Sequence, residues 1–170
     1  MEGKPRLLPA GDQAILIEFG AEINPQMNRR VHEFARRAGA KKIPGIGELI
    51  PSYCSVLISF AQTASWAREF LDPKPLEAAL PPVVKEVPVL YGGEYGPDIS
   101  FVAEHNGINV EEVIRLHSGQ TYLVYVVGFS PGFTAMGIVP QEIQAPRLPS
   151  PRTKVPAGSV GIGGQQTGIY

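Results

Sequence analysis

The hydrophobic and polar positions in the first half of the chain predict two strands and one helix. Residues 14–19 are mostly β-branched and aromatic, and residues 55–60 alternate small polar with apolar side chains, so both segments are typical of strands. Between them, apolar residues recur at helical spacing after Asn24 and Pro25, a pair typical of a helix N-cap and first turn. This helix should end at Gly39.

The second half predicts shorter elements separated by glycine and proline. Residues 85–91 and 122–127 have the pattern of strands, and residues 98–106 have the pattern of a short helix. A further short helix should start at Asn109, with Glu112 three positions later as its capping-box partner. After residue 127 glycine, proline and short polar residues dominate, which predicts tight turns and short strands.

A proline pair divides the chain into two predicted domains. Residues 65–71 have the pattern of a short helix, and Pro81-Pro82 follow it and fix an extended linker. We therefore expect a small α+β domain at residues 1–82 and a second domain at residues 83–170. The sequence stops at Tyr170 in the middle of a strand pattern, so we interpret the second domain as truncated at its C-terminus.

Composition and charge exclude several classes of protein. The 170 residues are 44% hydrophobic and 18% charged, which supports a packed core and argues against wholesale disorder. The formal net charge of −1 provides no basic face for nucleic acid, and no apolar run reaches the length of a membrane span. Because the amino terminus lacks the apolar core of a signal peptide, we expect a cytoplasmic protein. A single cysteine excludes an internal disulfide and a cysteine-based zinc site.

Three basic residues near the C-terminus suggest an anion-binding site. Arg147, Arg152 and Lys154 are the only charged side chains after Glu142, and each arginine follows a proline that stiffens the loop. Guanidinium groups grip carboxylate or phosphate through paired hydrogen bonds, so these residues can form an anion clamp. The alternative is ordinary surface charge on a turn. Because this stretch contains no acidic partner, the two interpretations are evenly balanced.

Two glycine-rich segments match known functional loops only in part. Residues 158–168 lack the dinucleotide-binding pattern, because Gln166 stands where glycine or alanine is needed, and they lack the Gly-Lys-Ser/Thr of a phosphate loop. A tight turn or barrel corner is the favoured interpretation. In residues 128–133, two phenylalanines can line an apolar pocket or plug the end of a barrel. Ser130 fits the serine hydrolase pattern, but Pro131 removes the N–H that the oxyanion hole needs, which excludes that class.

Two of the three histidines end successive predicted short helices. At these positions, held by His105 and His117, the helix dipole favours a protonated imidazole. His117 can act as an acid–base or anion-binding group near Tyr122, although capping of its helix is the favoured interpretation. No cluster of histidines and carboxylates has metal-ligand spacing, so we expect no metal site.

Several motifs together resemble one known family. Residues 122–133, the pairs Pro146-Arg147 and Pro151-Arg152, and the run 155–170 closely resemble the allophanate hydrolase subunit 1 family, also called the carboxyltransferase C/D-subdomain family. The resemblance implies a small α+β N-terminal domain followed by a cyclophilin-like β-barrel. It also implies that the chain normally continues past Tyr170, so the barrel should be incomplete here. Ala135-Met136 departs from the family pattern at the pocket.

The resemblance implies three alternative activities. The first is that of the B subunit of an ATP-dependent 5-oxoprolinase, which opens 5-oxo-L-proline to L-glutamate together with a carboxyltransferase-like C subunit and an A subunit. ATP would serve the complex, and the identity of the subunit that binds ATP stays open. This chain alone should be inactive. The second is a KipI-like inhibitor of a sporulation histidine kinase. The third is a component of allophanate hydrolase or urea carboxylase, with biotin supplied by a partner.

The same resemblance assigns site residues. For the first activity, a catalytic group stabilises a developing anion or a substrate carboxylate. It comprises Arg147, Arg152, Lys154 and His117. A second group shapes the pocket and supplies polar contacts to the substrate. It comprises Gly128, Phe129, Gly132, Phe133, Ser159, Gln165 and Gln166.

Overall fold

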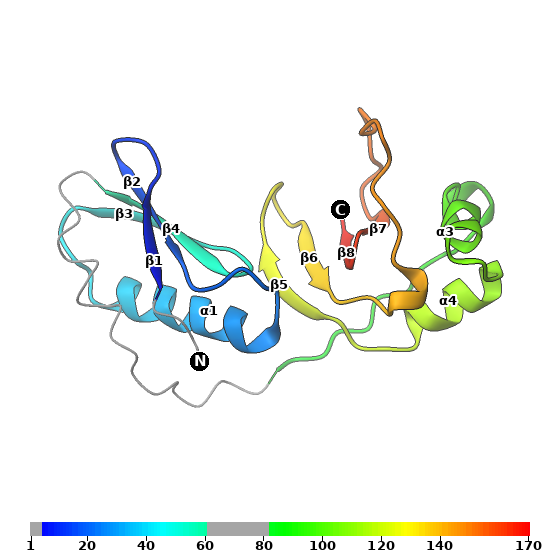
Figure 1. The fold of residues 1–170 in the computed structure, drawn as a ribbon, viewed down its shortest axis with the longest axis horizontal. Helices are drawn as coiled ribbons and strands as arrows, with labels where there is room; N and C mark the ends of the chain where they lie inside the picture. Colours follow the sequence, from blue (N-terminus) through cyan, green and yellow to red (C-terminus); the bar gives the residue numbers. More distant parts are fainter. Residues whose placement is uncertain (1–4, 61–81) are drawn as a thin grey trace. The chain divides into compact units, whose positions relative to one another are not determined.

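The computed structural model describes residues 5–60 and 82–170, so the predicted helix at 65–71 lies outside the described residues. The chain divides into two compact units, Met1–Pro81 and Pro82–Tyr170. Each unit combines helix with an antiparallel sheet, which confirms the predicted α+β class (Figure 1). No helix in these described ranges has the length and apolar character needed to cross a membrane.

The first unit is built on a four-stranded antiparallel sheet with the strand order β1-β2-β4-β3. Its strands are β1 (Arg6–Pro9), β2 (Ala14–Glu18), β3 (Ile46–Pro51) and β4 (Ser55–Phe60). β2 and β4 confirm the two predicted strands. The pattern predicts neither β1 nor β3, because β1 has four residues and β3 contains Gly47 and ends on Pro51. Pairing with β2 and β4 makes these weak segments strands.

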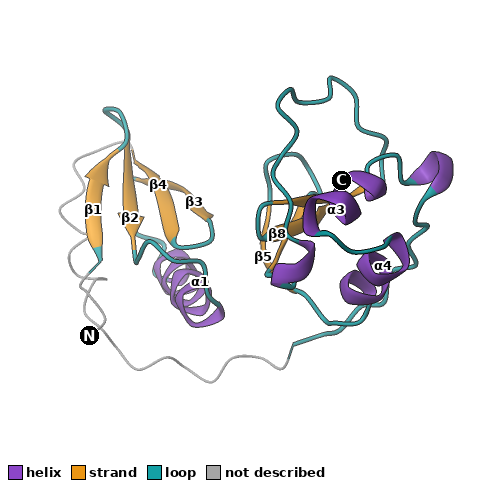
Figure 2. Ribbon diagram, turned by 45° about the vertical axis from the view of Figure 1, so that its right-hand side comes forward, coloured by secondary structure: helices purple, strands orange, loops and turns teal. Residues whose placement is uncertain are grey.

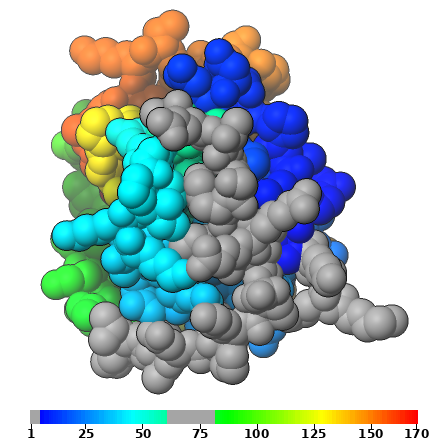
Figure 3. All heavy atoms as spheres, turned by 90° about the vertical axis from the view of Figure 1, so that its left-hand side faces the viewer, coloured from blue at the N-terminus to red at the C-terminus, as the bar shows by residue number. Residues whose placement is uncertain are grey.

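One helix covers a face of this sheet. Helix α1 (Pro25–Ala40) begins as predicted, since the Asn24 side chain accepts a hydrogen bond from the Met27 N–H at 2.8 Å, and it ends one residue later than expected. The buried core between helix and sheet comprises Ile17, Phe19, Val31, Phe34, Ala38, Val56 and Ile58. Figure 2 shows α1 along the sheet, and Figure 3 shows the unit's surface around β1 and β2 in blue.

The second unit begins with an extended segment, residues 82–91, that pairs with no described strand. The prediction of a strand at 85–91 is therefore wrong. Its β-branched residues keep the backbone extended, but a hydrogen-bonded ladder also requires a neighbouring strand. The large apolar side chains exposed along the segment are Val83, Val84, Val87 and Leu90.

Two short helices follow, after a 3₁₀ turn at Gly93–Tyr95. They are α3 (Ile99–Asn106) and α4 (Val110–Ser118), and both confirm predicted helices. The Asn109 side chain caps α4 by accepting the Glu112 N–H at 2.8 Å. The carboxylate of Glu112 pairs with Arg115 and not with the cap, so only half of the predicted capping box forms.

An open sheet completes the second unit. Its strand order is β5-β6-β8-β7, and all neighbours are antiparallel. The strands are β5 (Leu123–Val127), β6 (Thr134–Gly137), β7 (Val160–Gly163) and β8 (Gln166–Ile169), with a 3₁₀ turn at Gln141–Ile143 after β6. β5 confirms the predicted strand. Within the described residues the sheet does not close into a barrel, in keeping with the expectation of an incomplete one.

The two faces of this sheet have different surroundings. Ile162 of β7 packs against the core that α3 and α4 form with Val139 and Ile143. Thr167 of β8 lies opposite Ile162 and faces the same helices. Because side chains alternate along a strand, Gln166 and Gly168 face away from the helices. Each candidate residue on β8 is thereby assigned to one face.

Candidate functional site

His117 lies at the centre of a buried polar cluster on the helix side of the second sheet. Its side chain is 7% exposed. Nδ1 lies 2.6 Å from the hydroxyl of Tyr91, and Nε2 lies 3.0 Å from Oγ1 of Thr167. The favoured interpretation of a helix cap is therefore wrong, because both ring nitrogens bond to other segments of the chain.

Burial shifts the pKa values in this cluster toward the neutral forms of its side chains. Burial lowers the pKa of His117 and raises the pKa values of Tyr91 and Tyr122. The Tyr122 hydroxyl donates a hydrogen bond to the His117 carbonyl at 2.9 Å. Thr167 is 4% exposed, which leaves no room for a substrate at its hydroxyl. The cluster therefore ties α4 to β8 and to the end of the extended segment, and it offers no open catalytic base.

Arg152 is paired with a carboxylate that the sequence pattern did not indicate. Its guanidinium donates to both oxygens of Asp98 at 2.5 and 2.8 Å. Asp98 lies 54 positions earlier in the chain, so the lack of acidic residues near Arg152 is not a lack of partners. Asp98 occupies the start of α3 but caps no N–H with its side chain. Arg152 therefore holds the 144–159 loop against this helix.

We expect Arg152→Gln to raise the pKa of Asp98. The hydrogen bonds from Arg152 hold this pKa below its ordinary value of 3.8, and glutamine removes the charge while it keeps a donor. Titration of the Asp98 carboxyl followed by NMR measures the change. Arg115→Gln is the matched control, because Arg115 pairs with Glu112 on α4. If the pKa of Asp98 were the same in the wild type and in the Arg152→Gln variant, the result would contradict the pairing of Arg152 with Asp98.

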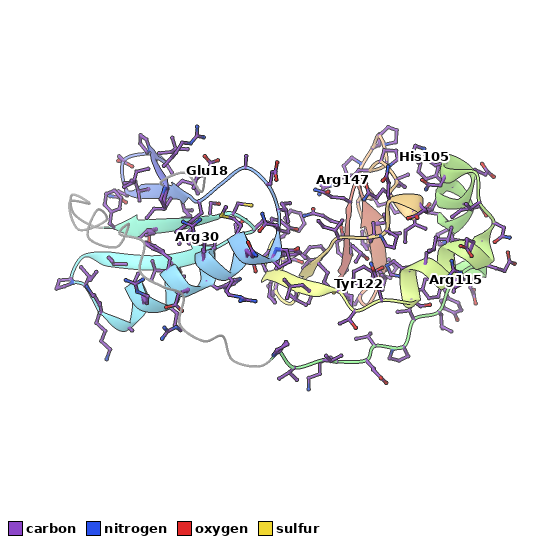
Figure 4. All side chains as sticks on the ribbon, turned by 60° about the horizontal axis from the view of Figure 1, so that its bottom comes forward. Glu18, Arg30, His105, Arg115, Tyr122 and Arg147 are labelled. Carbon is purple, nitrogen blue, oxygen red and sulfur yellow. The ribbon has the colours of Figure 1, made fainter. Side chains whose placement is uncertain are left out.

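Arg147 differs from Arg152, because within residues 5–60 and 82–170 no carboxylate pairs with it. Its side chain is exposed and lies along the backbone of β7, where its Cγ and Nε are 3.2 Å from the point that a Cβ on Gly163 would occupy. In Figure 4 Arg147 lies beside the red strands, and Arg115 lies on α4. Lys154 is also exposed and has no ion pair in the described ranges. Of the three basic residues in the predicted clamp, Arg147 and Lys154 therefore have no ion pair in the described ranges.

The glycine-rich run forms the β7–β8 hairpin. Gly163 pairs with Gln166, and the turn between them is tied to the preceding loop, since the Val139 N–H donates to the carbonyl of the exposed Gln165 at 3.0 Å. The Gln166 side-chain amide nitrogen is buried and has no hydrogen-bond partner. Ser159 contributes its carbonyl, which accepts the Tyr170 N–H at 2.9 Å. The favoured interpretation of a tight turn is correct.

The 128–133 loop closes on itself and leaves one phenylalanine outside. The Gly128 N–H donates to the Phe133 carbonyl at 3.0 Å, and Gly132 turns the chain with φ +84°. Phe133 packs over Gly168 and against Tyr170, with ring centroids 4.8 Å apart. Phe129 is 96% exposed. Phe133 therefore covers the sheet face, whereas Phe129 projects outward and meets Phe133 edge-on, with ring centroids 6.0 Å apart.

These placements divide the predicted site residues between two faces of one sheet. Gln166 and Phe133 lie on the face turned away from the helices, and Arg147 lies over the same face at Gly163. His117 lies on the opposite face and cannot join them. The motif search missed Thr167, Tyr91 and Asp98. Had β8 been predicted as a strand, the alternation of side chains along it would have placed Thr167 and Gln166 on opposite faces of the sheet.

The rest of the described structure adds little to the site. The first unit has a hollow of about 420 Å³ that no predicted site residue lines. Its lining comprises Gln13, Gly45, Ile46, Gly47, Ser59 and Phe60. Among the described residues, no three histidine, cysteine or carboxylate side chains lie close enough together to hold a metal ion.

Comparison with solved structures defines the class of fold. Over 98% of its length the chain matches 12% of the Kluyveromyces lactis urea amidolyase, with a TM-score of 0.73 and 20% identity, which shows a shared fold. The crystal structure of TTHA0988 matches over 93% of this chain and 32% of that chain, with a TM-score of 0.80 and 33% identity. The fold is that of a domain found within larger, multi-domain proteins.

The chain belongs to the family described as carboxyltransferase domain, subdomain C and D, whose model matches residues 5–170. The B subunit of the Bacillus subtilis 5-oxoprolinase is 40% identical, over 94% of this chain and 74% of that protein. The B subunit of the Escherichia coli O157:H7 5-oxoprolinase is 36% identical, over 94% of this chain and 75% of that protein. The family predicted from the carboxy-terminal motifs is confirmed.

Proposed function

We propose that this chain is the B subunit of an ATP-dependent 5-oxoprolinase complex, which hydrolyses 5-oxo-L-proline to L-glutamate together with a carboxyltransferase-like C subunit and an A subunit. The observation that carries this proposal is the set of relatives at 34–40% identity, each named as the B subunit of a 5-oxoprolinase. The low identity to the urea amidolyase supports only a common fold.

The reaction sets the demands on the site. Water adds its oxygen to the lactam carbonyl carbon, the carbon–nitrogen bond breaks, and the nitrogen gains a proton to become the amino group of glutamate. Charge builds up on the carbonyl oxygen in the transition state, and the substrate carries a carboxylate throughout. Unpaired cationic and N–H donor groups on one face suit both charges. Among the described residues Arg147 and Gln166 are such groups, whereas His117 supports the fold from the opposite face. Lys154 adds a further exposed positive charge.

The glycine-rich run does not have the form of a nucleotide-binding loop. In nucleotide-binding loops a glycine-rich turn leads from a strand into the N-terminus of a helix, which points N–H groups at the phosphates. Here the glycine-rich run leads from β7 directly into β8. We therefore assign ATP use to the complex and derive no step at this chain through the nucleotide.

The test is reconstitution. Glutamate release from 5-oxo-L-proline is measured with ATP, with the complete B subunit mixed with the A and C subunits of the same organism. We expect turnover that requires ATP and is lost when the B subunit is omitted. A verified, folded complex that releases no glutamate, or one that works equally well without the B subunit, would overturn the proposal.

A further inference from the structure

Arg147 and Gln166 are neighbours across the β7–β8 hairpin. Gly163 and Gln166 are directly paired, so a Cβ at Gly163 would lie about 5 Å from the Cβ of Gln166 on the same face. Arg147 fills the space of that absent Cβ, with its Nε 3.2 Å from the position. The exposed guanidinium therefore lies over the hairpin pair that carries the Gln166 side chain.

Among the described residues, the Gln166 amide nitrogen has no hydrogen-bond partner and Arg147 has no ion pair. A buried N–H that lacks a partner destabilises the fold, so such groups are rare and are often found at functional positions. The Gln166 amide nitrogen is one of these, and Arg147 has no carboxylate partner in the described ranges. Arg115 and Arg152, by contrast, each pair with a carboxylate. The hairpin thus combines the Arg147 guanidinium, which has no ion pair in the described ranges, with the unsatisfied amide donor of Gln166.

Two aromatic side chains flank this hairpin. Phe133 packs over Gly168 and against Tyr170, on the same face as Arg147 and Gln166. Phe133 and Tyr170 offer apolar contact to a ring, and Arg147 offers a charge at the edge. A ligand of matching chemistry has a carboxylate, a compact apolar ring and an oxygen that accepts one hydrogen bond.

We propose that Arg147 and the Gln166 side-chain amide bind a small cyclic carboxylate, with the Arg147 guanidinium on the carboxylate and the Gln166 amide on a carbonyl oxygen of the ring. This inference rests on the proposed function for the identity of the ligand, 5-oxo-L-proline, and names the groups that hold it. The bound ligand supplies the acceptor that the Gln166 amide nitrogen lacks. Gln166 thus acts on the oxygen where negative charge develops.

The experiment uses the assembled complex. We expect Arg147→Ala to raise KM for 5-oxo-L-proline at least about tenfold, and Arg147→Lys to recover only part of the loss, because lysine lacks the planar fork. Gln166→Leu should lower kcat/KM about tenfold or more without lowering the melting temperature, because leucine removes a buried donor that has no partner. If Gln166 were only structural, the leucine variant would lose stability and keep KM.

Two glycine substitutions form a matched pair. Gly163→Ala places a methyl group 3.2 Å from Arg147 Cγ and Nε, so it displaces the guanidinium and should raise KM. Gly161→Ala meets only Tyr170 Cε2, at 3.9 Å, and should leave KM unchanged. Among inhibitors, cyclopentanecarboxylate should lose potency in Arg147→Ala, whereas 2-pyrrolidinone, which lacks the carboxylate, should not.

Titration of the complex with 5-oxo-L-proline in the absence of ATP separates the two proposals. Arg147-dependent binding without ATP, together with no turnover after ATP is added, would support the ligand site and overturn the catalytic proposal. Turnover with unchanged KM in Arg147→Ala and unchanged kcat/KM in Gln166→Leu would overturn the ligand site and leave the catalytic proposal intact. The absence of both turnover and binding would overturn both proposals.

Discussion

Replacement of His117 by leucine should lower the free energy of unfolding of the second unit by about 2–4 kcal/mol. The substitution removes hydrogen bonds at both ring nitrogens and leaves the hydroxyls of Tyr91 and Thr167 without their partner. Thr167 is 4% exposed, so water cannot replace the lost bond. The end of the extended segment also loses its attachment to α4.

Amide hydrogen exchange at residues of α4 and β8 measures this loss within the second unit. His105→Leu is the control, since His105 is exposed near the end of α3 and stacks on Phe101, with ring centroids 6.0 Å apart. Equal protection of α4 and β8 in the His117→Leu variant and the wild type would contradict a stabilising role for the cluster.

The same histidine should make stability depend on pH. Burial lowers the pKa of His117 below its ordinary value of 6.5, so below about pH 6.5 the unfolded chain takes up a proton more readily than the folded one. Stability is therefore full above pH 6.5 and falls as the pH drops toward the folded-state pKa. His117→Gln removes the titrating group, and the fall should be smaller in that variant over the same range.

Replacement of Gly168 by alanine should destabilise the second unit by about 1–3 kcal/mol. The new methyl group would lie 2.7 Å from Phe133 Cζ and 2.8 Å from the backbone oxygen of Thr134. Phe133 can rotate, but the Thr134 oxygen belongs to β6 and moves only if the ladder shifts. Phe133 would therefore leave its place beside Tyr170, or β6 and β8 would separate.

Gly161→Ala is the matched comparison, because Gly161 pairs directly with Gly168 and its nearest contact would be Tyr170 Cε2 at 3.9 Å. Urea unfolding, monitored by amide hydrogen exchange at residues of β6 and β8, distinguishes the two variants. Equal losses of stability in both would contradict the role of the contacts with Phe133 and β6, because the entropy of the unfolded chain makes a glycine-to-alanine change stabilising.

Local patterns predicted the elements that carry their own signal. The strands at β2, β4 and β5 have continuous apolar or alternating residues, and α1 and α4 have asparagine caps, which form as predicted. β6, β7 and β8 have four residues each and contain glycine, so their side chains do not mark them as strands. Residues 85–91 show the converse, because a strand sequence without a described neighbour remains unpaired.

The sequence by itself determined the α+β class, the boundaries of the strongest elements and the family, because each depends on residues close together in the chain or on motifs of fixed spacing. It also identified Arg147 and Gln166 as candidates. Only the tertiary structure decided what each candidate contacts. Arg152 meets Asp98 across 54 positions, and His117 meets Thr167 across 50. Such contacts depend on how the strands and helices pack, and no local pattern encodes them.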